Sequence, residues 1–157
     1  EALKIKGLIK NWGVSNFDTD DIKDLLLVPH GDKCFINQVL YNIRYRGIEY
    51  DLIPFCKKND IGIMAYSPFC NTPSMLGISK TDAVLQDLSS KEGKSLYSLL
   101  LNFVIRDNDV FTVFKTTRDE HIKENMKNVY SPISEQSLKL LNDIFPPPSS
   151  KQPLFKI

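Results

Sequence analysis

The chain has 157 residues, of which 42% are hydrophobic and 25% charged, values typical of one globular domain. Its 20 basic and 19 acidic side chains give a formal net charge of +1, which provides no electrostatic reason to expect a nucleic acid or an anionic membrane as a partner. No apolar stretch approaches the ~18 residues of a membrane helix, and the first residues lack the apolar core and cleavage site of a signal peptide.

Short apolar runs and helical patterns alternate along the chain. The apolar runs predict strands over residues 8–14, 34–39, 61–66 and 109–114. The helical patterns predict helices over residues 20–26, 50–57, 84–88, 96–105, 121–127 and 134–144. Asp18 or Thr19 is expected to cap the first of these helices and Ser134 the last, while residues 69–79 read as an irregular connection.

The three cysteines are odd in number and show no CxxC spacing. They therefore predict neither a disulfide framework nor a zinc site. We expect Cys34, Cys56 and Cys70 to be buried free thiols in the reducing cytosol, because no local base accompanies any of them.

Four strand–helix units with nearly continuous apolar strands predict an α/β fold with a parallel sheet covered by helices. Such units fit a doubly wound open sheet, and they fit equally well one half of a (β/α)8 barrel of about 250 residues. Composition and periodicity leave both architectures open. In both of them, ligands bind beyond the carboxyl ends of the strands.

Polar side chains follow the predicted strands at these carboxyl ends. They belong to residues 15–16, 37–38 with 41–42, 66–67 and 115–117. Asn and Gln amides suit a primary carboxamide, Tyr66 offers a flat face to an aromatic ring, and Lys115 beside hydroxyls suits a phosphate. Asn and Ser are also common turn formers, and a single tyrosine is more often a core residue. The gathering of all these groups on one rim is what favours a binding site.

Several sequence blocks, taken together, resemble a known family. They are WGVSNF at residues 12–17, NQVLYN at 37–42, AYSP at 65–68, VFKT at 113–116 with HIKEN at 121–125, and FPPP at 145–148. In order and spacing they resemble the aldo-keto reductases, with a prokaryotic-type ending, over essentially the whole chain. The resemblance implies a TIM (β/α)8 barrel that reduces aldehydes and ketones with NAD(P)H.

Only the last four β/α units and the C-terminal tail of that barrel are matched. We therefore expect residues 1–157 to form a single domain, the C-terminal half of the barrel, with the N-terminal half absent from this chain. The absence of an initiator methionine agrees with that expectation. The catalytic Asp, Tyr, Lys and His of the family belong to the first four units. The resemblance thus implies that the isolated chain does not reduce carbonyls.

The resemblance assigns the nicotinamide end of a dinucleotide site to residues after the first three strands. Ser15, Asn16 and Gln38 would hold the nicotinamide carboxamide, and Tyr66 would stack on the nicotinamide ring. Ser67 would lie along the pyrophosphate, together with the segment from Phe69 to Asn71.

The resemblance also assigns the adenosine end. Lys115 and Thr116 would meet the adenosine ribose and a 2′-phosphate, and Glu124 and Asn125 would face the adenine. His121 stands where many NADPH-preferring relatives have an arginine, and a neutral imidazole binds phosphate less well than a guanidinium. NADP(H) is still expected over NAD(H), and no metal site is expected.

A half barrel exposes two strand edges and an apolar face, so we expect it to be completed by the missing half or to self-associate. The complete barrel would take a small aldehyde or ketone whose identity the sequence leaves open. Two alternatives remain at this point: a non-catalytic dinucleotide-binding sensor or regulatory subunit, and a self-associating half-barrel module without ligand.

Overall fold

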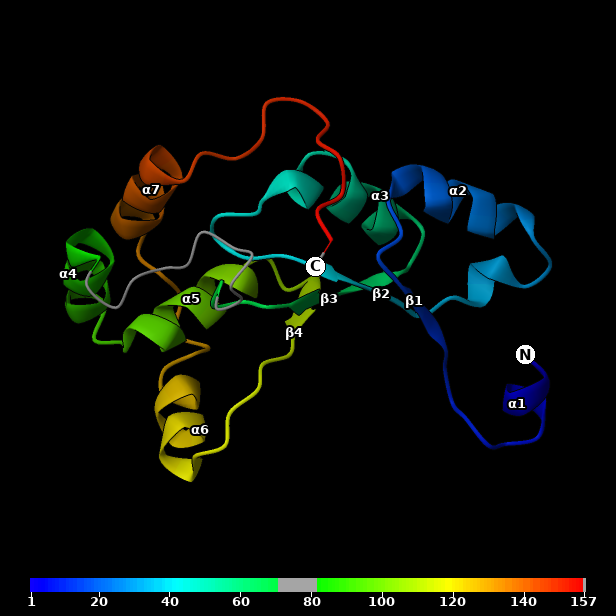
Figure 1. Cartoon of the computed structure of the whole chain (residues 1–157), viewed down its shortest axis with the longest axis horizontal. Coiled ribbons are helices and arrows are strands. Elements are labelled where there is room, and N and C mark those ends of the chain that lie inside the picture. Colours follow the sequence, from blue (N-terminus) through cyan, green and yellow to red (C-terminus); the bar gives the residue numbers. More distant parts are fainter. Residues whose placement is uncertain (71–81, 157) are drawn as a thin grey trace.

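The computed structural model describes residues 1–70 and 82–156. Its strands are β1 (Gly13–Ser15), β2 (Ile36–Leu40), β3 (Gly62–Tyr66) and β4 (Val110–Thr112). All pairings are parallel, and the strands form one sheet in the order β1-β2-β3-β4 (Figure 1). Each strand overlaps the apolar run that predicts it, although β1 and β4 are shorter than expected.

The helices follow the predicted alternation with the strands. They are α1 (Ala2–Ile5), α2 (Thr19–Leu27), α3 (Leu52–Lys58), α4 (Ala83–Lys91), α5 (Leu96–Val104), α6 (Asp119–Met126) and α7 (Glu135–Ile144), with 3-10 turns η1 (Gly31–Lys33) and η2 (Gly47–Glu49). Asp18 caps α2 by accepting bonds from the backbone of Asp20 and Asp21, and Ser134 caps α7 in the same way. Both predicted caps are confirmed.

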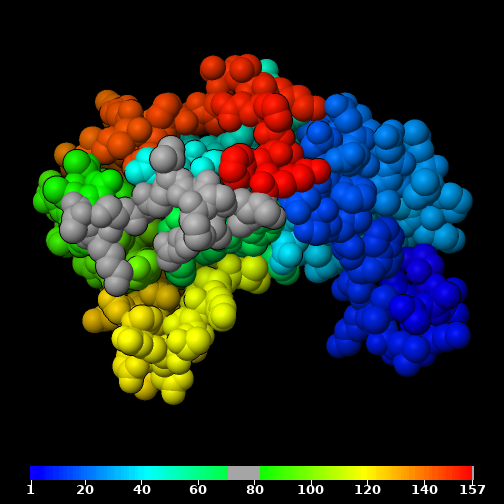
Figure 2. All heavy atoms as spheres, viewed as in Figure 1, coloured from blue at the N-terminus to red at the C-terminus, as the bar shows by residue number. Residues whose placement is uncertain are grey.

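The order of the strands distinguishes the two architectures that the sequence leaves open. A doubly wound sheet reverses its strand order at a switch point, whereas a barrel adds each strand beside the previous one. Here the spatial order equals the chain order without reversal. The molecule is an arch whose two ends, α1 and the region of α6, project to the same side (Figure 2). This is the geometry of a partial barrel.

The two faces of the sheet differ in burial. The register aligns Val14, Asn37, Ile63 and Val110 on one face, and the last three of these are buried. On the opposite face the register aligns Ser15, Gln38, Met64 and Phe111 in a row, and Phe111 is 57% exposed. The first face packs against helices, and the second would line the inside of a barrel.

The core has two parts. One lies between the sheet and helices α2 and α3, and the other joins α4, α5 and α7. The apolar face predicted for α5 is confirmed, since Leu99, Leu100 and Phe103 are almost completely buried. On α4, Leu85 and Leu88 are buried, whereas Val84 is 44% exposed. Within residues 1–70 and 82–156, no helix is long and apolar enough to cross a membrane.

All three cysteines are buried and free, as predicted. Burial raises the pKa of Cys56 from 9.0 to about 12 and that of Cys70 to about 11. In the unfolded chain these thiols ionise near their ordinary pKa, whereas in the native state they remain neutral, so stability should fall as the pH rises above 9. The expected loss is about 1.4 kcal/mol per thiol for each pH unit between the unfolded and folded pKa values.

Urea unfolding between pH 8 and 10.5 measures this loss, and a Cys56→Ala/Cys70→Ala variant serves as the control with a flatter profile. Native thiols should also resist a disulfide reagent at pH 8 and react only in denaturant. Rapid labelling of the folded protein would contradict the assignment of these cysteines as inert core residues.

Candidate functional site

The carboxyl ends of β1, β2 and β3 bring four predicted site residues into one cluster. Ser15 Oγ donates to the backbone oxygen of Gln38 at 3.1 Å, and the backbone N–H of Asn16 donates to the same oxygen at 2.8 Å. The Tyr66 hydroxyl donates to Asn16 Oδ1 at 3.0 Å. These side chains therefore lie together, as the sequence predicts, because parallel strands end on the same rim.

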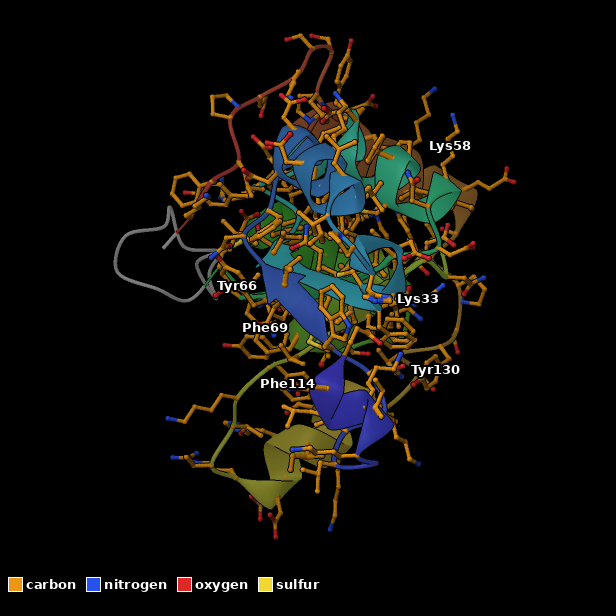
Figure 3. All side chains as sticks on the ribbon, turned by 90° about the vertical axis from the view of Figure 1, so that its right-hand side faces the viewer. Lys33, Lys58, Tyr66, Phe69, Phe114 and Tyr130 are labelled. Atoms are coloured by element: carbon orange, nitrogen blue, oxygen red, sulfur yellow. The ribbon has the colours of Figure 1, made fainter. Side chains whose placement is uncertain are left out.

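Figure 3 shows on which edge of the sheet this cluster lies. Tyr66, the last residue of β3, and Phe69, which follows that strand, lie on one side of the molecule. Lys33 and Lys58, which precede β2 and β3, lie on the opposite side. The cluster therefore occupies the carboxyl edge, where α/β proteins bind ligands.

The backbone at these strand ends is unusual. Asn16, directly after β1, has a φ of 58°, and Ser67, directly after β3, has a φ of 53°. Left-handed backbone at a residue other than glycine costs free energy and concentrates at functional sites. Both positions belong to the predicted dinucleotide site, and the conformation turns each peptide sharply at the rim.

Met64 joins the cluster although the sequence reading did not single it out. The register places it beside Gln38, and the Gln38 Nε2 donates to the Met64 sulfur at 3.1 Å. The two-residue period of a strand could have predicted this position, because Met64 lies two residues before Tyr66 and shares its face of the sheet. A sulfur is a weak acceptor, so the Gln38 amide retains capacity for a stronger partner.

Three polar residues that the sequence placed on the rim are structural instead. Asn37 is fully buried, and its amide donates to the backbone oxygen of Phe17 at 2.8 Å. Asn42 is also buried and donates to the backbone oxygen of Ser67 at 3.0 Å. Tyr41 is buried in an ionic network. Asn37 is buried because neighbouring residues of a strand point to opposite faces of the sheet, and Gln38 takes the face that carries the cluster.

The Tyr41 hydroxyl donates to Glu49 Oε1 at 2.6 Å and accepts a bond from Arg106 at 2.7 Å. Burial raises the pKa of Tyr41 above its ordinary value of 10.0. For Glu49, burial alone would raise the pKa, but bonds from Arg46 and Tyr41 and the charges of Arg46 and Arg106 lower it below 4.5. This network fixes the β2–α3 connection behind the rim and leaves the Tyr41 hydroxyl no access to a substrate.

The predicted pyrophosphate segment divides into described and undescribed parts. The backbone oxygen of Ser67 is held by Asn42, and Ser67 is half-buried. The Phe69 ring is 8% exposed and packs against Tyr97 and Phe114, with ring centroids 4.9 and 5.5 Å apart. Its side chain is therefore a core group, and only its backbone is available to a ligand. Asn71 lies outside the described residues.

A second polar cluster follows β4. Thr116 Oγ1 accepts a bond from the backbone N–H of Arg118 at 3.3 Å and lies 3.5 Å from His121 Nδ1. Lys115 and Arg118 are exposed beside it, and Arg118 directly precedes α6. Two cationic side chains, a hydroxyl and an imidazole at the start of a helix are groups that can bind an anion, although Asp119 and Glu120 of the first turn offset the two positive charges.

The remaining predicted residues lie on α6. Glu124 and His121 line a hollow of about 330 Å³ together with Ser89 and Ser90 of α4 and Tyr97 of α5. Asn125 is 4% exposed, and its Oδ1 has no hydrogen-bond partner. A buried acceptor without a donor costs free energy. The described residues contain no group of acidic, cysteine and histidine side chains that could hold a metal ion.

The geometry can be compared with known proteins. A sequence profile described as the aldo/keto reductase family matches residues 1–145. The chain belongs to the aldo/keto reductase family. Its four-stranded parallel sheet is accordingly part of a TIM barrel, as the sequence blocks predict.

Two curated aldo-keto reductases illustrate the relationship. The chain is 34% identical over 154 residues to methylglyoxal reductase YeaE of Escherichia coli, a match that covers 98% of this chain and 54% of that protein. It is 32% identical over 148 residues to aldo-keto reductase family 1 member D1 of Oryctolagus cuniculus, covering 88% of this chain and 44% of that protein. The chain thus spans about half the length of these relatives.

Solved structures agree with the sequence relatives. An aldo-keto reductase from Klebsiella pneumoniae in complex with NADPH superimposes with a TM-score of 0.90 at 33% identity, over 99% of this chain and 55% of that one. A Bombyx mori aldo-keto reductase in complex with NADP gives a TM-score of 0.77 at 25% identity, over 90% of this chain and 47% of that one. The fold of this chain is therefore that of the matching part of these aldo-keto reductases.

Proposed function

We propose that this chain supplies the nicotinamide-dinucleotide site of an NADP(H)-dependent oxidoreductase that reduces aldehydes or ketones to alcohols. The observation that carries the proposal is the cluster of Ser15, Asn16, Gln38 and Tyr66 at the carboxyl rim of the sheet. Support comes from a solved relative of matching fold, which was crystallised with NADPH.

The amides of Asn16 and Gln38 and the Ser15 hydroxyl suit a nicotinamide carboxamide, because each can exchange hydrogen bonds with a primary amide. Tyr66 would offer its ring face to the nicotinamide, with its hydroxyl anchored on Asn16. A bound dinucleotide of this class supplies a hydride. The contribution of these residues is to fix which face of the ring meets the substrate.

The cluster after β4 suits the adenosine end. Lys115 and Thr116 would meet the ribose and 2′-phosphate, with His121 beside Thr116. Glu124 and the unpartnered acceptor of Asn125 would take the adenine amino group. Ser67 and the backbone from Phe69 to Asn71 would lie along the pyrophosphate. The two cationic side chains at this end, Lys115 and Arg118, favour NADP(H) over NAD(H).

We further propose that residues 1–157 are one domain, the second half of a barrel, and that the first half provides the proton-transfer residues. The state of the two tyrosines at the ends of β2 and β3 supports this division. Tyr41 is fully buried between Glu49 and Arg106, and the Tyr66 hydroxyl is bonded to Asn16. Neither is placed to protonate a carbonyl oxygen.

Co-expression with the first half of YeaE, the part of that protein outside the match, tests the proposal. The complemented barrel should bind NADPH and oxidise it with methylglyoxal, whereas residues 1–157 alone should show no turnover. Turnover by the chain alone would place the proton donor here and refute the division of roles. NADPH binding without turnover in the native protein would favour the sensor alternative.

Within the complemented barrel, Tyr66→Ala should weaken NADPH binding about 2- to 10-fold, since an aromatic pair contributes about 0.5–1.5 kcal/mol. Tyr50→Ala is the matched control, because Tyr50 is 49% exposed and lies outside both clusters. Fluorescence titration measures both affinities. Equal affinities in the two variants would show that Tyr66 does not stack on the nicotinamide.

A further inference from the structure

Helix α6 carries the adenosine end of the site but has almost no apolar anchorage. Asn125 is its one buried residue. Its large apolar side chains are exposed, Ile122 by 46% and Met126 by 43%. Hydrophobic burial therefore contributes little to the position of this helix, and other contacts must hold it.

Those contacts lie mainly in the connection that follows the helix, where Val129 is buried in the core. The polar ones come from α5 and the residues just before it. Lys94 Nζ donates to the backbone oxygens of Asn128 at 3.2 Å and Ser131 at 2.8 Å. Ser98 Oγ donates to the backbone oxygen of Lys127 at 2.7 Å. Asn102 Nδ2 donates to the backbone oxygen of Val129.

Lys94, Ser98 and Asn102 recur at intervals of four residues, so they form one stripe along the helix direction. We call this stripe the polar ladder. Every carbonyl that it holds belongs to the connection that leaves α6, residues 127–131. In return, Asn128 Nδ2 donates to the backbone oxygen of Gly93 at 3.2 Å. The ladder thus fixes the C-terminal end of α6 to α5.

We propose that the polar ladder positions the adenosine-binding end of the dinucleotide site, an inference that rests on the proposed function. The hollow lined by His121 and Glu124 of α6 has Ser95, Leu96 and Tyr97 on its other wall. Its width is the distance between α6 and the start of α5. The ladder sets that distance, since it joins the end of α6 to α5 and to the residues just before it, and one of its members, Lys94, lines the hollow.

Ser98 is the informative member of the ladder. It is fully buried, and it does not line the hollow, so it acts on a ligand only through α6. Lys94 lines the hollow itself and could touch a ligand, which makes it a poorer test. Ser98 is therefore a positioning residue and not a contact residue.

The experiment uses the native protein, with any sequence that precedes Glu1, and two fragments of the dinucleotide. Ser98→Ala should weaken binding of 2′,5′-ADP about 5- to 10-fold, the effect of one lost hydrogen bond. Binding of nicotinamide mononucleotide should not change, because Ser15, Asn16 and Gln38 do not depend on the ladder. Equal weakening of both fragments, or of neither, would overturn the proposal.

Thr19→Val is the matched control. It removes a buried hydroxyl that donates to Asp51 at 2.8 Å, at the other end of the molecule from α6. Thr19→Val should lower the thermal midpoint about as much as Ser98→Ala and leave 2′,5′-ADP binding unchanged. A similar loss of binding in this control would attribute the effect to general destabilisation and overturn the proposal.

Hydrogen exchange separates the failure of this inference from failure of the proposed function. Ser98→Ala should speed amide exchange in residues 119–126 whether or not any nucleotide binds. Unchanged exchange in α6 overturns the positioning role, and absence of 2′,5′-ADP binding in the unmodified protein overturns the proposed function. Asn128→Gly, at an exposed position with a φ of 58°, retains the backbone conformation and should show the same pattern more weakly if Ser98→Ala fails to fold.

Discussion

Replacing Glu49 by glutamine is expected to lower the free energy of unfolding by about 3–5 kcal/mol. The Glu49 carboxylate accepts bonds from Arg46 at 2.7 and 2.8 Å, from Arg106 at 3.0 Å and from Tyr41 at 2.6 Å. Both guanidinium groups also lie over the Phe103 ring, 5.1 and 4.1 Å from its centroid. Without the carboxylate, two largely buried cations near one aromatic ring lose the anion that they share, and of its ion pairs in the described part of the chain Arg106 retains only that with the exposed Asp107 at 3.5 Å.

The pH dependence of the free energy of unfolding is a second measurement of the contribution of Glu49. The pKa of Glu49 lies below its ordinary value of 4.5 in the folded chain, so its contribution is fully present above that pH and is lost as the pH falls through the folded pKa. Glu49→Gln should flatten this acid limb in urea unfolding experiments. Asp20→Asn is the control, because the Asp20–Lys23 pair is 66% and 54% exposed and should contribute far less. Similar losses in the two variants would show that the buried network is not a main source of stability.

Replacing Gly31 by alanine is expected to destabilise the fold by about 3 kcal/mol or more. A Cβ at this position would lie 1.8 Å from the backbone oxygen and 2.8 Å from the carbonyl carbon of Leu25. Both atoms belong to the backbone of α2, so relief requires that the helix move away from η1. Leu25 and Leu26 pack against the core on that helix, and the shift would loosen their contacts.

Gly47→Ala tests whether the effect is steric and local. Its added Cβ would meet Gln152 Oε1 at 3.2 Å and Gln152 Cβ at 3.3 Å, and relief requires only a small shift of this exposed residue near the C-terminus. Gly47→Ala should therefore change the urea midpoint little, and reduced freedom of the unfolded chain would add about 0.4–1 kcal/mol of stability. If both substitutions have the same effect, the close approach at Gly31 does not control packing.

Local patterns in the sequence were sufficient to predict the helices and strands and the residues that cap two of the helices. Asp18 and Ser134 cap α2 and α7 because the cap geometry depends on residues three positions away. The apolar spacing of α5 likewise predicted its buried face, since that helix packs on its neighbours along its whole length. The cluster of Ser15, Gln38 and Tyr66 follows from the parallel sheet alone, because strands of one direction end on one rim.

Features that depend on distant partners were not predictable from local patterns. Tyr41 follows β2 like a rim residue, but its hydroxyl meets Arg106, which lies 65 residues further along the chain. Phe69 is drawn into the core by Tyr97, 28 residues further along the chain on α5, and by Phe114, which follows β4. Asn125 is buried on a helix whose other residues are not, a burial that the pattern of that helix alone does not indicate. In each case a tertiary contact overrides what the neighbouring sequence indicates.

The monotonic strand order also governs how the sheet assembles in time. Contacts between β1 and β2 join residues 23 apart, and those between β2 and β3 join residues 26 apart. Contacts between β3 and β4 span 47 residues, because α4 and α5 both lie in that crossover. Loop-closure entropy rises with this separation, and non-local pairings form slowly. The first three strands should therefore associate early, as the chain emerges from the ribosome, and β4 should join last, after α5 has formed the surface on which it docks.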